Sequence, residues 1–136
     1  MKPHEEARDE LVGQWIEKAH LDLDVACNLV SQGARFFPAA AFHAQQAAEK
    51  YLKALLVHHQ IEFPRTHDLG ELLDLLAPVE GPLVSLLAEA TALNPYSVDM
   101  RYPEEMPEIS DGEAKQATEL ARAVRDAVLT ALANRP

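Results

Sequence analysis

Apolar side chains that recur every three or four residues constrain the fold of this chain most strongly. In residues 5–32 they form one continuous stripe, made of Val12, Trp15, Ile16, Ala19, Leu23, Ala26, Cys27 and Val30. This spacing matches the turn of an α-helix, so it predicts an amphipathic helix with one buried face. We assign four charged residues of the segment to the other faces, namely Glu17, Lys18, Asp22 and Asp24. Gly33 then favours a left-handed end to the helix.

A second helix is predicted over residues 36–61. Pro38 is tolerated only in the first turn of a helix, so this one should begin near Phe36 or Phe37. Pro64 ends it, because residues just before a proline are displaced from helical geometry. Its apolar stripe consists of Ala41, Ala44, Ala48, Tyr51, Leu52, Leu55 and Leu56. The alanines allow another backbone to approach closely, and an obligate dimer would explain such a face.

Two shorter helices are expected in the middle of the chain. The stretch THDLGELLDLLAP predicts a helix that is capped by Thr66 or Asp68 and ended by Pro78. Residues 82–93 have leucines at helical spacing and predict the next helix.

The last part of the chain divides into a loop and a long helix. Residues 94–108 hold three prolines and no helical period, so they predict a long loop of the kind that is often functional. Ser110 with Glu113 three residues later has the pattern of a capping box, which predicts the start of the final helix.

The pattern predicts an all-α fold, an up-and-down antiparallel helical bundle with three long and two shorter helices. No segment has the alternation of a strand. The 136 residues, 48% of them hydrophobic, are enough to bury the core of one domain, so we assign residues 1–136 to a single helical domain.

Charge and cysteine content restrict the classes of function. The formal net charge of −10 argues against broad affinity for nucleic acid, although a small basic site remains compatible with it. Cys27 cannot form an internal disulfide, and its place in the apolar stripe predicts a buried, inert thiol. Together with the absence of a signal peptide or membrane span, this favours a cytoplasmic protein.

The second helix carries a row of polar residues beside its apolar stripe. His43, Gln46, Lys50 and Lys53 follow one another at spacings of three, four and three. Two interpretations remain open. The first is that these positions are solvated, or that His43 and Gln46 meet a neighbouring helix. The second is that the row is a polar seam that lines a pocket or a second subunit. The absence of an acidic residue from the row, in so acidic a chain, favours the seam.

The sequence lacks the usual signatures of metal, phosphate-loop and nucleophile chemistry. His58 and His59 are adjacent and point about 100° apart on a helix, so they are poorly placed to chelate one ion. No paired cysteines, HExxH motif or glycine-rich phosphate loop is present. We therefore expect no metal site and no cofactor.

Several motifs together resemble the HEPN domain family (higher eukaryotes and prokaryotes nucleotide-binding). They are the helix FHAQQAAEKYLKALL, the connector PRTHDL and the arginine-tyrosine-proline of YSVDMRYP before the last helix. The resemblance extends from Trp15 to about Leu132. It implies a helical bundle that forms homodimers. It also implies a minimal nucleotidyltransferase as partner, in pairs that often act as toxin–antitoxin modules.

Many members of this family are metal-independent ribonucleases with an arginine, four to six residues and then a histidine near the final helix. This chain departs from that signature, because Arg101 is in the expected loop but the last histidine of the sequence is His67. The resemblance therefore implies a non-catalytic module that binds a nucleotide or a partner. A ribonuclease that uses His43 or His67 as a rearranged base, and an oligomerising scaffold without ligand, remain as alternatives.

In the binding hypothesis, Lys50, Arg101 and His43 neutralise phosphate. Either Tyr96 or Tyr102 stacks on a base. The predicted nucleotide-binding residues are His43, Gln46, Lys50, His67, Arg101 and Tyr102. The competing interpretation is that Arg101 and Tyr102 only fix the loop, with Arg101 paired to an acid such as Asp99.

Overall fold

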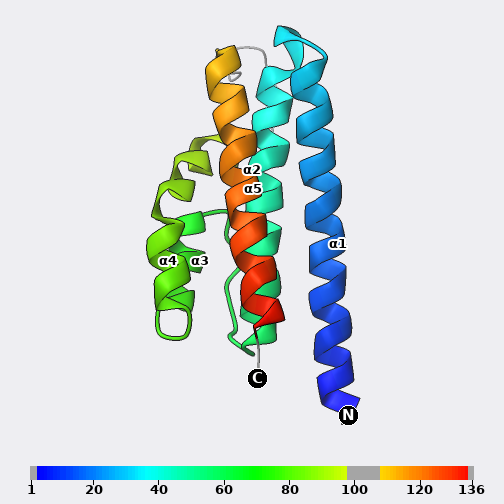
Figure 1. Cartoon of the computed structure of the whole chain (residues 1–136), viewed down its shortest axis with the longest axis vertical. Helices are drawn as coiled ribbons and strands as arrows, with labels where there is room; N and C mark the ends of the chain where they lie inside the picture. Colours follow the sequence, from blue (N-terminus) through cyan, green and yellow to red (C-terminus); the bar gives the residue numbers. More distant parts are fainter. Residues whose placement is uncertain (1–2, 98–107, 135–136) are drawn as a thin grey trace.

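The computed structural model describes residues 3–97 and 108–134, and the regular elements within these ranges are all helices. The three long helices are α1 (Pro3–Ser31), α2 (Phe37–His58) and α5 (Asp111–Ala133). They lie side by side, and α1 runs in the opposite direction to α2 and α5 (Figure 1). The shorter elements are α3 (Leu69–Leu76), α4 (Gly81–Leu86) and the 3₁₀ segments η1 (Ala34–Phe36) and η2 (Ala88–Ser97). The predicted all-α bundle is confirmed.

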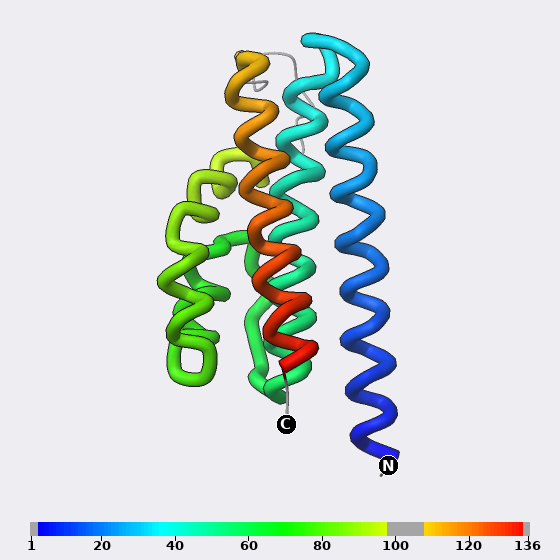
Figure 2. Tube along the Cα trace, in the orientation of Figure 1, coloured from blue at the N-terminus to red at the C-terminus, as the bar shows by residue number. Residues whose placement is uncertain are grey.

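The shorter helices form a second layer on one side of the long ones. The chain leaves α2 at the lower end of the bundle, returns through the connector 59–68, and then turns back on itself between α3 and α4 (Figure 2). The α2 helix packs against α1, α5, α3 and η2, so it is the central element of the fold. In the described ranges, no helix is both long enough and apolar enough to cross a membrane.

The fourth predicted helix is wrong in its extent. Instead of one α-helix over 82–93, α4 ends at Leu86 and a 3₁₀ segment continues to Ser97. Pro95 lacks a backbone N–H, and a proline disfavours α geometry in the residue before it, which is Asn94. The Asn94 side chain instead accepts from the backbone N–H of Leu69, at 2.9 Å, and so joins this segment to the start of α3.

The α2 helix also ends earlier than predicted. Its last residue is His58 rather than residue 61, and Gln60 has a positive φ of 58°. The predicted loop begins late as well, because residues 94–97 belong to η2. Residues 98–107 lie outside the described part of the chain.

The predicted capping residues are confirmed where the structure describes them. The side chain of Asp68 accepts from Gly70 N at 2.9 Å, so Asp68 rather than Thr66 is the cap of α3. Ser110 and Glu113 form a reciprocal capping box at the start of α5. Two unpaired N–H groups at that helix end are satisfied by this exchange.

The alanine-rich face of α2 is covered within the chain itself. Ala40, Ala41, Ala44, Ala47 and Ala48 are all fully buried. The α1 helix makes the most extensive packing with α2, and α5 the next. The small side chains therefore serve close packing between helices of one chain, and no second subunit is needed to explain them.

Tyr51 of α2 is fully buried and hydrogen-bonded to His20 of α1, with 2.5 Å between the hydroxyl and Nδ1. Burial raises the pKa of Tyr51 from 10.0 to about 12. A raised pKa in the folded state means that this group's contribution to stability is present below pH 10 and is lost as the pH rises towards 12.

We expect Tyr51→Phe to remove that part of the alkaline loss of stability. Between pH 9 and 12 the wild-type protein should lose about 2–3 kcal/mol more than the variant, because two pKa units correspond to that energy. Urea unfolding followed by circular dichroism at each pH measures the difference. Parallel curves for the two proteins would contradict the assignment.

Candidate functional site

The carboxylate of Asp22, on α1, contacts two of the predicted site residues of α2. Asp22 Oδ1 lies 3.0 Å from His43 Nδ1, and Asp22 Oδ2 lies 2.5 Å from Lys50 Nζ. The Asp22 side chain is 13% exposed, whereas those of His43 and Lys50 are 32% and 23% exposed. The acid is therefore the most buried member of the cluster, and the two basic side chains are the part that reaches solvent. We call these three residues the Asp22 cluster.

The prediction that Asp22 lies on an outer face of the first helix is wrong. Asp22 is buried, because it lies three residues after Ala19 and four before Ala26, beside the apolar stripe. A buried carboxylate requires partners. His43 and Lys50 supply them, since residues seven apart lie on the same face of a helix.

A second carboxylate, Glu49, pairs with Lys53 of the row and with His67 of the connector. Glu49 is buried and forms an ion pair of 2.9 Å with Lys53, one turn further along α2. Its other oxygen, Oε1, lies 2.8 Å from His67 Nδ1. Because His67 precedes the cap of α3, this contact ties the connector 59–68 to the middle of the bundle.

Lys53 is enclosed by aromatic rings as well as by its acid. Its ammonium nitrogen lies 5.6 Å from the centroid of Trp15 and 5.7 Å from that of Phe63. Only 9% of its side chain is exposed. This lysine is thus part of the interior, where ring faces and a carboxylate replace water around the charge.

The predicted site residues consequently separate into two groups. His43 and Lys50 meet at Asp22, whereas His67 pairs with Glu49. Gln46 donates to the side-chain oxygen of Gln45 at 2.7 Å. Arg101 and Tyr102 lie outside the described residues, as does Asp99.

Gln45 of α2 joins this helix to the connector 59–68. It was not among the site residues predicted from the sequence. It is fully buried and donates to the backbone carbonyl of His67 at 2.9 Å.

Tyr96, the alternative stacking residue, is partly buried. This burial is the main cause of the upward shift in its pKa, and the nearby Glu113 adds to the shift.

The geometry of the Asp22 cluster permits two kinds of chemistry. When His43 donates its Nδ1 proton to Asp22, the opposite nitrogen Nε2 is left as a proton acceptor, as in an oriented general base. When both ring nitrogens are protonated, His43 and Lys50 together outweigh the carboxylate by one positive charge. An anion such as a phosphate would then be attracted to the exposed side of the cluster.

Two further titratable side chains, His59 and Cys27, have partners outside these clusters. His59 Nε2 lies 2.7 Å from Glu80, which joins the end of α2 to the start of α4. Cys27 is half-buried rather than buried, and its sulfur accepts from Arg122 at 3.0 Å. Within the described ranges, no group of three histidine, cysteine or acidic side chains is arranged to hold a metal ion.

Comparisons with known proteins point to one family. A family model described as the HEPN domain matches residues 12–131 of the chain. A search of the curated proteins gave no match. Among solved structures, the chain is similar to the crystal structure of TT1696 from Thermus thermophilus, with a TM-score of 0.68 and 30% sequence identity. That similarity covers 88% of this chain and 96% of the other.

Proposed function

Because the chain belongs to the HEPN domain family, we propose that it is a non-catalytic module that binds a nucleotide through the Asp22 cluster. The observation behind this assignment is that Asp22 fixes both His43 and Lys50 at a partly exposed position. Fixed side chains lose less conformational entropy when a ligand binds than free ones do.

Charge supports a phosphate group as the part of the ligand that is bound. The chain has a net charge of −10, whereas the Asp22 cluster combines one acid with a lysine and a histidine and is therefore not acidic itself. Lys50 and a protonated His43 can each donate to phosphate oxygens, and such charge-assisted bonds are the stronger ones. Arg101 and Tyr102 are part of the same proposal on sequence grounds alone, as a further cation and a stacking ring.

The proposed assembly follows the resemblance of the sequence to the family. We propose a homodimer that associates with a minimal nucleotidyltransferase in the cytoplasm, in the manner of a toxin–antitoxin pair. Co-expression with a nucleotidyltransferase encoded beside this protein, followed by purification through a tag on one chain, tests the pairing. Recovery of the tagged chain alone would contradict it.

Binding of ATP should raise the melting temperature of the wild-type protein and not that of Lys50→Ala. A ligand that binds only the folded state adds about 2.7 kcal/mol of stability at a hundredfold excess over its Kd. Differential scanning fluorimetry over a range of ATP concentrations measures the shift.

The matched control is Lys115→Ala, which removes an exposed lysine from α5 that pairs with Asp111 and forms no ion pair with the Asp22 cluster. Each variant is compared with itself in the absence of ATP, so a lower starting stability does not alter the result. An equal ATP response in Lys50→Ala and Lys115→Ala would rule out the Asp22 cluster as the binding site.

The contact between Asp22 and His43 also supports a second candidate, a metal-independent ribonuclease. A ribose 2′-hydroxyl needs a proton acceptor, and His43 Nε2 is oriented for that role by the carboxylate. Structured RNA incubated with the protein and EDTA should then be cleaved, and His43→Ala should abolish the cleavage. Intact RNA with the wild-type protein would exclude this candidate.

A further inference from the structure

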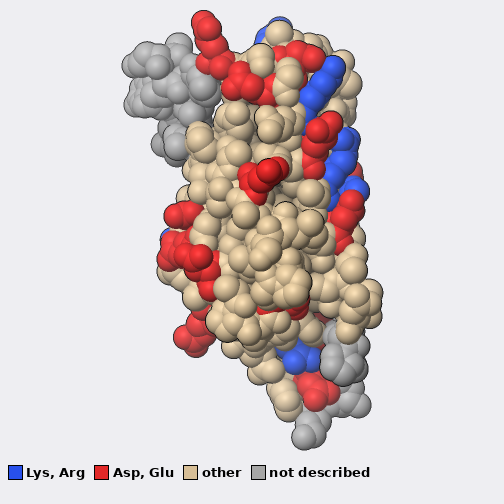
Figure 3. Space-filling view, turned by 60° about the vertical axis from the view of Figure 1, so that its left-hand side comes forward, with Lys and Arg blue, Asp and Glu red and all other residues tan. Residues whose placement is uncertain are grey.

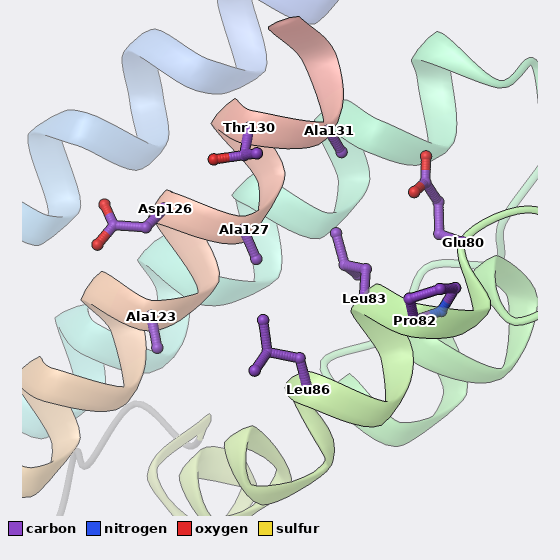
Figure 4. Close-up of a pocket in the computed structure, with 9 residues that line it drawn as sticks. All are labelled: Glu80, Pro82, Leu83, Leu86, Ala123, Asp126, Ala127, Thr130 and Ala131. Atoms are coloured by element: carbon purple, nitrogen blue, oxygen red, sulfur yellow. The ribbon is translucent and has the colours of Figure 1, made fainter. Parts of the chain in front are cut away.

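An apolar groove runs between α4 and α5, on the side of the bundle away from α1. It encloses about 570 Å³. Figure 4 shows Leu83 and Leu86 of α4 pointing towards Ala127 and Ala131 of α5 across this space. Leu86 is 73% exposed, more than any other large hydrophobic residue in the described ranges. An apolar surface of this kind is unfavourable in water unless something covers it.

The groove is bordered by acids. Of the nine described residues that line it, the two charged ones are Glu80 and Asp126. Each has a partner in the chain, His59 for Glu80 and Arg125 for Asp126, but a carboxylate accepts several hydrogen bonds at once. Figure 3 shows the same side of the molecule, where a largely uncharged area is bordered by Asp and Glu, with Lys and Arg mostly towards one edge.

We propose that this groove binds an amphipathic helix of a partner protein, with leucine-like residues on one face and lysine or arginine along both borders. The α5 side of the groove spans Ala123 to Ala131, which is about 12 Å or two helical turns. Apolar residues at positions i, i+3 or i+4, and i+7 of the partner would fill it. The basic residues of the partner would meet Glu80 and Asp126.

Charge argues against a second copy of this chain as the occupant. In a two-fold symmetric contact the same patch faces itself, so Glu80 and Asp126 of one copy would approach those of the other. Like charges brought together in an interface are unfavourable, and the chain carries a net charge of −10. The groove shares no residue with the Asp22 cluster, so this inference does not depend on nucleotide binding.

The test uses two fluorescent peptides of about 18 residues, each with leucines on one helical face and either lysines or glutamates on the other. Fluorescence anisotropy should show that the lysine peptide binds the wild-type protein. Leu86→Asp should weaken the binding of this peptide by about tenfold or more, since the substitution places a charge on the apolar α4 side of the groove. Asp126→Lys should weaken the lysine peptide and strengthen the glutamate peptide.

The matched control is Leu21→Asp, which makes the same change at a residue of α1 that is 65% exposed and outside the groove. Its affinity for the lysine peptide should stay within about twofold of wild type. Failure of the lysine peptide to bind at about 1 mM, or equal weakening by Leu21→Asp and Leu86→Asp, would overturn the proposal. So would sedimentation showing a wild-type dimer that Leu86→Asp dissociates, because a second copy would then occupy the groove.

Discussion

Replacing Glu49 by alanine should destabilise the protein by about 3–5 kcal/mol, since it leaves the buried Lys53 without its carboxylate. The ring faces of Trp15 and Phe63 offset only part of that loss. The free energy of unfolding is obtained from guanidinium titrations followed by circular dichroism. Trp15, the only tryptophan of the chain, gives a second signal from the same region.

Two further proteins establish the cause of that loss. Glu17→Ala removes an exposed acid of α1 and should change the stability by less than about 0.5 kcal/mol. The double variant Glu49→Leu with Lys53→Met removes both charges at similar volume and should recover most of the loss. A double variant as unstable as Glu49→Ala would contradict the explanation based on an unpaired buried lysine.

Leu55→Ala should cost about 2–5 kcal/mol, because it opens a cavity in the central helix of the bundle. Leu55 is fully buried in the core that α2 shares with its neighbours. The matched change is Leu21→Ala, at a position that is 65% exposed, and there the cost should stay below about 1 kcal/mol.

The same guanidinium titrations measure both leucine variants. Equal losses at the two positions would show that Leu55 is not packed as the structure has it. A smaller slope of the unfolding free energy in Leu55→Ala alone would instead indicate a change in the compactness of its unfolded or folded state.

The starts of α2 and α5 could be predicted because local chemistry determines them. Pro38 restricts the start of α2, and the exchange between Ser110 and Glu113 begins α5. The break after Leu86 was not predictable in this way. The 3₁₀ segment that follows is joined near its end to the start of α3, where Asn94 accepts from Leu69 N, a contact between residues 25 positions apart in the chain.

The candidate site could be predicted only in part, for a similar reason. His43 and Lys50 were identifiable from their spacing on one helix, but the carboxylate that joins them comes from another. Asp22 lies beside an apolar stripe, so whether its side chain faces α2 or solvent depends on how α1 is rotated about its axis. Glu49 was missed because it directly precedes Lys50 and so lies about 100° from it around the helix, although it is one turn before Lys53.

The separation of His67 from His43 follows from the same rotation. Glu49 points towards the connector, where it pairs with His67, whereas its neighbour Lys50 points towards α1. One sequence shows that these residues are polar and near each other, but the distribution of partners is decided by the packing of three separate segments.

The proposed function requires that the Asp22 cluster faces the ligand, and not Glu49 with its partners Lys53 and His67. The most direct measurement is the NMR spectrum of the histidine rings during a titration with ATP. The ring resonances of His43 should move progressively to saturation, and those of His67 and His59 should stay unchanged. Movement of His67 without His43, or no movement of any ring signal at about 10 mM ATP, where even a Kd of 1 mM would give near saturation, would contradict the claim.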